Sequence, residues 1–374
     1  MAASAKRESG IRISKRDTIP FTKALGIRVL AVIGALLVSA VMVLVMGYSP
    51  AGVFAQIVTG SVGTPKALVS TIERTIPLLL SSLAIILAFK MRFWNIGANG
   101  QIALGAVAAA FFAYKFAGTI PHVPLIVLMF IAAAIAGGVW GVIPALAKAK
   151  WGTNETLFTL MMNYISIYII QFLRRGPWED PKMKSFGQTP MFDPSARLTD
   201  VLGVYSGWIV AVVLVIVVYV YLYYTKQGYE IAVVGESNNT ARYAGMSVQG
   251  IFIRTMLISG ALAGIAGMLK ISGADFKLNE SVAGSIGFTA ITIAWLSKLN
   301  PLTSLVVAFL FSALEKGCES VSSASNLRVN GLNIPSASAM VIMGIVLFFV
   351  LGCEFFINYR IHVTRAERGR EAAQ

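Results

Sequence analysis

The residues best suited to hold a polar solute in this sequence are four side-chain amides set among apolar residues. Three occur in the stretch NIGANGQ, residues 95–101, and the fourth occurs in LMMNYIS, residues 160–166. A carboxamide both donates and accepts hydrogen bonds, which suits sugar hydroxyls and nucleobase edges better than a phosphate or a carboxylate. The candidate path residues are Asn95, Asn99, Gln101 and Asn163.

These amides also have a structural interpretation. Gly97 and Gly100 permit a broken helix whose amides point into a cavity, as in the discontinuous helices of transporters. Alternatively, the amides cap the start of a helix and bond to a neighbouring helix, and Asn163 equally suits an interhelical hydrogen bond. The sequence leaves both interpretations open.

No group of residues in the chain suits covalent or metal catalysis. There is no H-E-x-x-H motif, and the two histidines and two cysteines (His122, His362, Cys318 and Cys353) are scattered along the chain. The absence of any Gly-Lys dipeptide excludes a G-x-x-x-x-G-K-[ST] phosphate loop. We therefore expect no catalytic residue, metal or cofactor, and any ATP-driven work requires nucleotide machinery on another polypeptide.

Membrane-spanning helices are the elements that must position the amides. The mean hydropathy is +0.74 and only 13% of the 374 residues are charged, against about 25% in soluble domains. Long uncharged runs must form helices in lipid, because each run has to satisfy its own backbone hydrogen bonds. We expect an all-α polytopic membrane protein in the lipid bilayer, with ten spans at 27–46, 75–89, 99–114, 124–147, 155–173, 207–224, 251–272, 282–298, 301–317 and 335–357. The third and eighth spans are short and interrupted by glycine, so each either crosses the bilayer or re-enters it.

The placement of basic residues predicts the orientation. The net charge is +14, and the Lys and Arg residues gather at span ends and in the two tails. Such residues favour the cytoplasmic side, which places both termini inside the cell. No basic face is interleaved with aromatic residues, so a nucleic-acid partner is not expected. A basic tail (1–26) and a C-terminal tail (359–374) flank the membrane domain, 27–358.

Two loops differ from the short connections elsewhere. The outer loop, 174–206, contains four prolines, which favour an extended and irregular chain. It is either a landing site for a partner protein or simply exposed. The inner segment, 226–250, is polar and longer than a connection needs to be. Ser237 or Asn238 can cap a short helix there and Gly245 can end it. This helix suits docking on a protein better than lying in lipid headgroups, because its apolar face is small.

The stretch SGALAGIAG, residues 259–267, places Gly260 and Gly264 four residues apart. This spacing lets two helices approach closely. We expect tight packing inside the subunit, with a subunit interface as the alternative.

Two stretches together carry a family resemblance. NIGANGQ (95–101) and GYEIAVVGESNNTARYAG (228–245) resemble the permease subunits of bacterial ABC importers for nucleosides and simple sugars, within the branched-chain amino acid and ribose-type permease family. The long lead-in, 47–74, is most similar to the longer permease of a nucleoside importer. The resemblance implies a fold similar to the vitamin B12 importer permease, in the bacterial cytoplasmic (inner) membrane, with a cytoplasmic coupling helix between spans six and seven.

Residues matching the second motif inherit the ATPase-coupling role that the resemblance implies. They are Gly228, Tyr229, Glu230, Gly235, Ala241, Arg242, Tyr243 and Gly245. The chain departs from the family pattern at three places. Ala232 replaces a usual arginine, Ser237-Asn238 replaces a frequent Asn-Pro, and Asn99 stands where an acidic residue is common.

The resemblance also implies the partners. They are a cytoplasmic ABC ATPase, a second paralogous permease, and a substrate-binding lipoprotein or periplasmic protein. It favours nucleosides as the solute, with ribose-like sugars and branched-chain amino acids as alternatives. An ion-coupled secondary transporter is the competing class, but no Asp or Glu falls at the middle of a predicted span.

Overall fold

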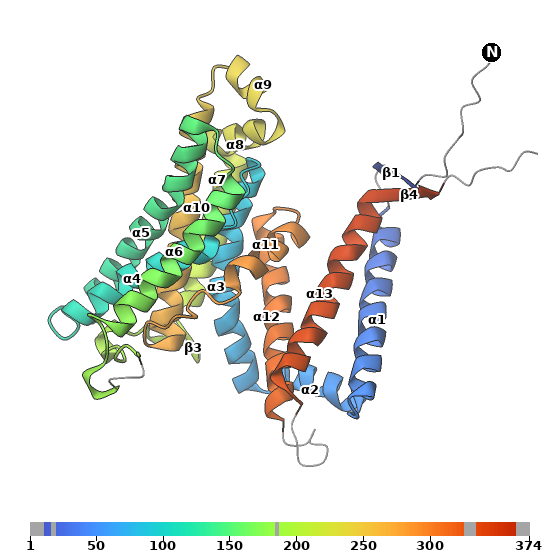
Figure 1. Ribbon diagram of the computed structural model, residues 1–374, viewed down its shortest axis with the longest axis horizontal. Helices are drawn as coiled ribbons and strands as arrows, with labels where there is room; N and C mark the ends of the chain where they lie inside the picture. Colours follow the sequence, from blue (N-terminus) through green and yellow to red (C-terminus); the bar gives the residue numbers. More distant parts are fainter. Residues whose placement is uncertain (1–10, 16–19, 184–186, 325–333, 364–374) are drawn as a thin grey trace, which may run out of the picture. The chain divides into compact units, whose positions relative to one another are not determined.

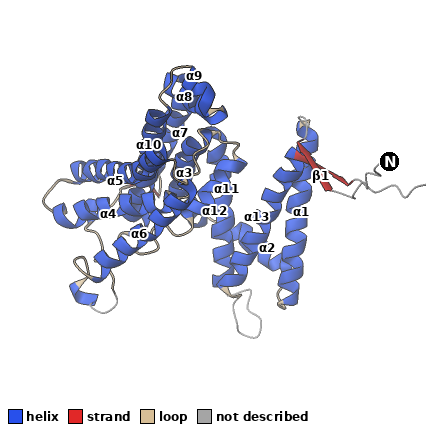
Figure 2. Ribbon diagram, turned by 45° about the horizontal axis from the view of Figure 1, so that its top comes forward, coloured by secondary structure: helices blue, strands red, loops and turns tan. Residues whose placement is uncertain are grey.

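Helices make up most of the computed structural model, which describes residues 11–15, 20–183, 187–324 and 334–363 (Figure 1; Figure 2). Every predicted span coincides with a helix. Two helices that the sequence analysis did not predict are α2 (Pro50–Val62) and α8 (Lys226–Glu236). Both are shorter than the roughly 20 residues a span needs.

The chain divides into two compact units, Met1–Gln56 with Cys318–Gln374, and Ile57–Gly317. In the first unit, α1 (Phe21–Val45) packs against α13 (Ser336–Asn358). An ion pair of 2.5 Å joins Arg28 on α1 to Glu354 on α13. Beyond these helices, β1 (Ile11–Lys15) pairs antiparallel with β4 (Tyr359–Val363), a small ladder that the all-α prediction did not include.

The second unit holds the candidate sites. Its helices are α3 (Pro65–Lys90), α4 (Ala98–Phe116), α5 (His122–Trp151), α6 (Glu155–Arg175), α7 (Gly207–Tyr224), α8, α9 (Asn238–Tyr243), α10 (Val248–Lys270) with the π-helical turn η3 (Ile271–Asp275), and α11 (Ile286–Leu296). The boundaries between the units fall within α2 and α12 (Pro301–Ser323).

Eight of the described helices are long and apolar enough to cross a bilayer, so the chain is a multi-pass membrane protein. They are α1, α3, α5, α6, α7, α10 with η3, α12 and α13. The helices at the third and eighth predicted spans, α4 and α11, are not among them. With 11 residues, α11 is only about 16 Å long, half of a ~30 Å hydrocarbon core.

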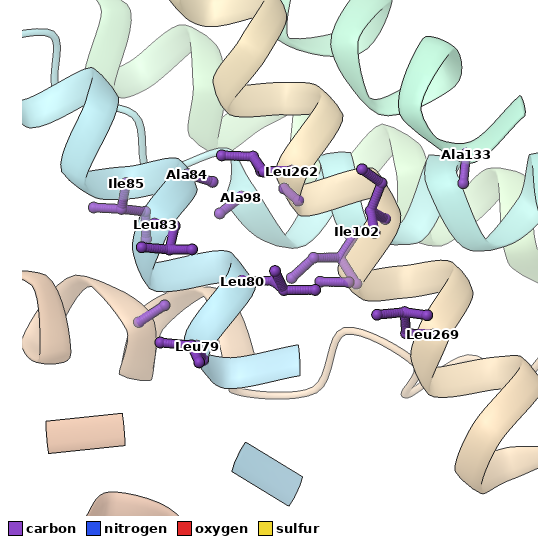
Figure 3. Close-up of a cluster of buried hydrophobic side chains, with 14 of the residues drawn as sticks. Leu79, Leu80, Leu83, Ala84, Ile85, Ala98, Ile102, Ala133, Leu262 and Leu269 are labelled. Atoms are coloured by element: carbon purple, nitrogen blue, oxygen red, sulfur yellow. The ribbon is translucent and has the colours of Figure 1, made fainter. Parts of the chain in front are cut away.

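The core of the second unit is built around α10, which packs against α3, α4 and α5. Figure 3 shows Leu79 and Leu80 of α3, Ile102 of α4, and Leu262 and Leu269 of α10 gathered in one buried cluster.

Glycines set how closely the helices of this core approach. A Cβ on Gly264 would lie 2.2 Å from the carbonyl oxygen of Ala133 on α5, and one on Gly267 would lie 2.1 Å from that of Ile102 on α4. Both distances are too short for any side chain, and Gly260 likewise meets the backbone of Gly137 at 2.3 Å. The prediction of tight packing inside the subunit is therefore confirmed.

The glycines of residues 95–101 do not break a helix. Gly97 is the N-cap of α4, which then runs without interruption, so the predicted break lies before the helix and not inside it. The preceding link, residues 91–97, is not helical, yet Met91 and Phe93 on it are fully buried. A buried irregular link must find hydrogen-bond partners for its backbone, because no water is at hand to supply them.

The outer loop is more ordered than its prolines predicted. Two short turns, η1 (Pro181–Met183) and η2 (Pro194–Ala196), and a hairpin of β2 (Asp200–Val201) and β3 (Val204–Tyr205) organise it. Tyr205 is fully buried and donates its hydroxyl to the carbonyl oxygen of Glu73 at 3.1 Å. Burial is the main cause that raises the pKa of Tyr205 well above its usual value, so the phenol stays protonated as a donor.

Candidate functional site

The structure brings the four predicted amides together at the start of α4. Asn95, Asn99, Gln101 and Asn163 are all buried, each less than 10% exposed. We call these four residues the amide network. Asn95 comes from the link, Asn99 and Gln101 from the first turn of α4, and Asn163 from α6.

Asn163 clamps the link with both ends of its carboxamide. Its Oδ1 accepts a hydrogen bond from the backbone N–H of Gly100 at 2.8 Å, and its Nδ2 donates to the carbonyl oxygen of Ile96 at 2.9 Å. One turn away on α6, Thr159 Oγ1 accepts from the N–H of Ile96 at 3.2 Å. α6 thus supplies the partners that this buried backbone lacks.

Asn95 and Gln101 pair with each other. Asn95 Nδ2 donates to Gln101 Oε1 at 3.2 Å, and Gln101 Nε2 donates back to Asn95 Oδ1 at 3.4 Å. Asn95 Oδ1 also accepts from the N–H of Gly97 at 3.0 Å, an Asx-type turn that directs the chain into the helix.

Asn99 joins the starts of two helices. Its Oδ1 accepts from the N–H of Gly287 in the first turn of α11 at 2.7 Å, and its Nδ2 donates to the carbonyl oxygen of Gly284 at 3.3 Å. An ionised carboxylate at this position has no proton to donate to Gly284. The departure from the acidic residue common in the family therefore fits this particular contact.

All four amides have hydrogen-bond partners within the chain. Their geometry holds the starts of α4 and α11 together against α6, which is the work expected of a cap and an interhelical bond. A role in a solute path stays a prediction, and it requires that some of these bonds be exchanged for bonds to the solute.

Seven of the eight motif residues lie on two helices, α8 and α9, and Gly245 follows the C-cap residue of α9; we call residues 226–245 the coupling segment. α8 is anchored at its start, where Thr225 Oγ1 accepts from the N–H of Gly228 at 3.2 Å. At its other end, a Cβ on Gly235 would lie 2.0 Å from the carbonyl oxygen of Lys90, the last residue of α3. α8 therefore sits directly on the end of a core helix.

α9 has the cap and stop that the sequence predicted. Ser237 Oγ accepts from the N–H of Thr240 at 3.3 Å, so Ser237 and not Asn238 is the cap. Gly245 takes φ +74° and ends the helix, with the N–H of Gly245 bonded to the carbonyl oxygen of Arg242 and that of Met246 to Ala241. This pair of bonds is the Schellman arrangement, which favours glycine at the left-handed position.

The motif residues on the coupling segment divide into two groups. Gly228, Gly235 and Ala241 are buried and hold the segment in place. Tyr229, Arg242 and Tyr243 are exposed, and Tyr243 reaches 94%. These three are the side chains available to a partner.

The Glu230 carboxylate forms an ion pair within the chain. Its Oε2 lies 2.9 Å from Nη2 of Arg254 on α10. Sequence reasoning placed Glu230 in the motif but gave Arg254 no partner, because a contact across 24 residues leaves no local spacing signal. The pair ties the coupling segment to the central helix of the unit.

A polar pocket of about 520 Å³ opens beside α9. Arg242 and Asn238 line one side, and the turn between α5 and α6 lines another. Within it, Lys148 and Glu155 form an ion pair of 2.5 Å.

Charged residues at the other end of the unit are also paired. Arg74 lies 3.3 Å from Glu315, and Arg174 lies 3.0 Å from Glu280. On the loop, Asp193 accepts from the N–H of Ser195, and that hydrogen bond lowers its pKa. Over the described ranges, no cluster of three or more His, Cys, Asp or Glu residues suits a metal ion.

Comparison with known proteins gives consistent matches. Residues 67–351 match the family described as branched-chain amino acid transport system / permease component. The chain is 31% identical to the glucose ABC transporter permease protein TsgB13 of Haloferax volcanii, over 97% of this chain and 96% of that protein. It is 30% identical to the guanosine ABC transporter permease protein NupP of Bacillus subtilis, over 86% and 91%. It is 27% identical to the nucleoside ABC transporter permease protein NupB of Lactococcus lactis, over 94% and 97%.

Proposed function

This chain belongs to the branched-chain amino acid transport system permease family, and on that premise we propose that it is the permease subunit of an ATP-driven importer for nucleosides or sugars. Relatives named as nucleoside, guanosine and glucose permeases match it over most of its length. Nucleosides are the favoured solute and neutral sugars the second choice.

The observation that carries this proposal is the coupling segment. It presents Arg242 and Tyr243 to a partner on a short capped helix. Its base rests on α3 through Gly235 and on α10 through the Glu230–Arg254 pair. Docking of an ATPase on α9 would therefore act directly on core helices, which is what coupling of ATP hydrolysis to transport requires.

The buried polar side chains support a neutral solute. Among the described residues, the buried polar side chains are those of serine, threonine, asparagine and glutamine. Ion-coupled transporters place carboxylates inside the membrane to carry the coupling charge. The described core offers neutral donors and acceptors instead, which favours an ATP-driven importer over a secondary transporter.

The remaining parts of the assembly follow from the same proposal. The chain has ten spans in a fold like that of the vitamin B12 importer permease, with α4 and α11 joining the eight long helices. Both termini and the coupling segment face the cytoplasm of a bacterial cell, across its inner membrane. The chain hydrolyses no ATP itself; it works with an ABC ATPase, a second paralogous permease and a binding protein that delivers the solute.

Substitution of the exposed residues of α9 tests the proposal. In the complete transporter, Arg242→Ala with Tyr243→Ala should abolish most ATP-driven uptake of labelled guanosine or glucose while leaving the amount of permease in the membrane unchanged. The matched control is Tyr224→Ala, which removes an exposed tyrosine from the end of α7. Undiminished uptake by the double variant would contradict the docking role. Uptake by this chain alone, driven by a cation gradient in liposomes, would favour the secondary transporter.

A further inference from the structure

One side of α6 exposes tyrosine and phenylalanine side chains where the neighbouring helix α5 exposes valine and isoleucine. The aromatic residues are Tyr164, Tyr168 and Phe172, and Met161 precedes them on the same side. All four are more than half exposed and recur every three or four residues, which places them on one side of the helix. We call these four residues the α6 aromatic face. It lies opposite Asn163 and Ser166, which are buried against the unit.

The two tyrosines lie deep in the span. α6 begins at Glu155, so a rise of 1.5 Å per residue places Tyr164 about 14 Å and Tyr168 about 20 Å along the helix. Both positions fall well inside a hydrocarbon core of ~30 Å. Tyrosines that face lipid concentrate at the two membrane surfaces, where their hydroxyls reach water.

Their hydroxyl groups have no partner in the described part of the chain. Tyr164 is 52% exposed and Tyr168 is 65% exposed, and neither hydroxyl makes a hydrogen bond to a described residue. A polar group left without a partner in hydrocarbon is costly. These hydroxyls therefore need water, a solute or another protein beside them.

The neighbouring helix α5 exposes side chains of a different kind. Its exposed residues at the same spacing are Val127, Ile131, Ile135 and Val139. They are all aliphatic and place no polar atom against the acyl chains. The exposed side of α7 is similar, with Tyr223 and Tyr224 only at its end.

We infer that the α6 aromatic face is a wall of the solute path, where Tyr164 and Tyr168 stack on the ring of a nucleoside or sugar. This inference rests on the proposed function. An aromatic ring offers a flat apolar surface that accepts either a nucleobase or the apolar side of a sugar, and the tyrosine hydroxyl adds a donor and an acceptor. The face carries no ionisable charge at neutral pH, which matches a neutral solute.

The α6 aromatic face and the amide network lie on opposite sides of the same helix, so their movements are linked. α6 holds the starts of α4 and α11 from its buried side through Asn163 and Thr159, and presents the tyrosines on its opposite side. Movement of α6 during transport would shift the solute contacts and the amide network together.

Cysteine labelling in the assembled transporter shows whether the α6 aromatic face is exposed to water or to lipid. In a background with Cys318 and Cys353 changed to serine, Tyr164→Cys and Tyr168→Cys are compared with Ile135→Cys and Val139→Cys on α5. A charged maleimide reacts with the thiolate, which forms only where water reaches the sulfur. The tyrosine positions should label several-fold faster than the α5 positions, and guanosine or glucose, whichever the transporter carries, should slow that labelling.

Ring-preserving variants test the stacking contact. Tyr164→Phe and Tyr168→Phe keep the stacking ring and lose one hydroxyl, so they should raise KM for uptake only slightly. Tyr164→Leu and Tyr168→Leu lose the ring as well and should raise KM several-fold. Tyr224→Leu is the control. Because both side chains are exposed, none of these changes disturbs the packed core.

The outcomes distinguish this inference from the proposed function. The parent transporter could take up solute with ATP while the tyrosine positions label no faster than those on α5. The inference that α6 lines the solute path is then wrong, and α6 faces lipid or a second permease. Labelling that no transported solute slows, together with an unchanged KM in the leucine variants, would also overturn it. Absence of ATP-driven uptake by the parent transporter would instead refute the proposed function, while the labelling contrast would still report whether the face is wet.

Discussion

The amide network and the coupling segment solve the same problem in opposite ways. Each contains helix starts, whose first N–H groups have no partner within the helix. At the start of α4, Asn95 accepts from one backbone N–H, and Asn163 bonds the backbone through both ends of its carboxamide. At α8 and α9, a single hydroxyl from Thr225 or Ser237 is enough. Helix starts that water can reach need one cap and leave other side chains free to contact a partner, whereas the buried start of α4 is held by several side-chain amides.

The largest effect is expected in the amide network. Asn163→Leu would leave the N–H of Gly100 and the carbonyl oxygen of Ile96 buried without a partner, which we expect to cost about 2 kcal/mol or more. Thermal unfolding of the purified protein in detergent measures this loss. Asn239→Leu on exposed α9 is the control and should leave the unfolding midpoint nearly unchanged. Equal unfolding midpoints for the two variants would contradict the expected difference between the buried amide network and the exposed coupling segment.

An intermediate effect is expected where the coupling segment meets the core. Glu230→Gln should cost about 1 kcal/mol, because its ion pair with Arg254 is partly exposed. Its larger consequence should be functional: more ATP hydrolysed for each solute molecule imported. Exchanging the two charges, with Glu230→Arg and Arg254→Glu together, should restore part of the coupling ratio. If the exchanged pair couples no better than either single variant, the contact does not transmit the movement.

The smallest effect is expected at the α9 cap. Ser237→Ala removes the acceptor for the N–H of Thr240 and should destabilise this short helix by about 1 kcal/mol or less. Hydrogen exchange should quicken within residues 238–243 only, and Ser237→Asp should preserve the parent rate. Faster exchange that spreads into α10 would show that the segment is less independent of the core than its single cap implies.

The features predictable from sequence were those with a local signal. Long uncharged runs located the helices, because a span needs about 20 consecutive apolar residues. The cap and stop of α9 followed from Ser237 and Gly245, whose preferences act within one turn. The close helix packing at Gly260 and Gly264 followed from their spacing in the same way.

Features that depend on contacts far apart in the chain were not predictable in this way. The sequence marked Asn99 as polar but did not indicate that its amide would bridge to Gly284 and Gly287. The motif gave Glu230 an ATPase-coupling role, and it did not indicate that Arg254 on α10 would be the partner of this carboxylate. Composition identified α6 as a span, but only the fold determined that Asn163 faces inward while Tyr164 and Tyr168 face outward.

The glycine contacts of α10 limit how this protein can change shape. Backbone lies against backbone where Gly264 meets Ala133 and where Gly267 meets Ile102. Sliding α10 along either neighbour by one residue would bring a side chain into a gap that admits only hydrogen. A one-residue ratchet between these helices is therefore blocked, and any gate must open by tilting this block as a whole or by moving the elements attached around it.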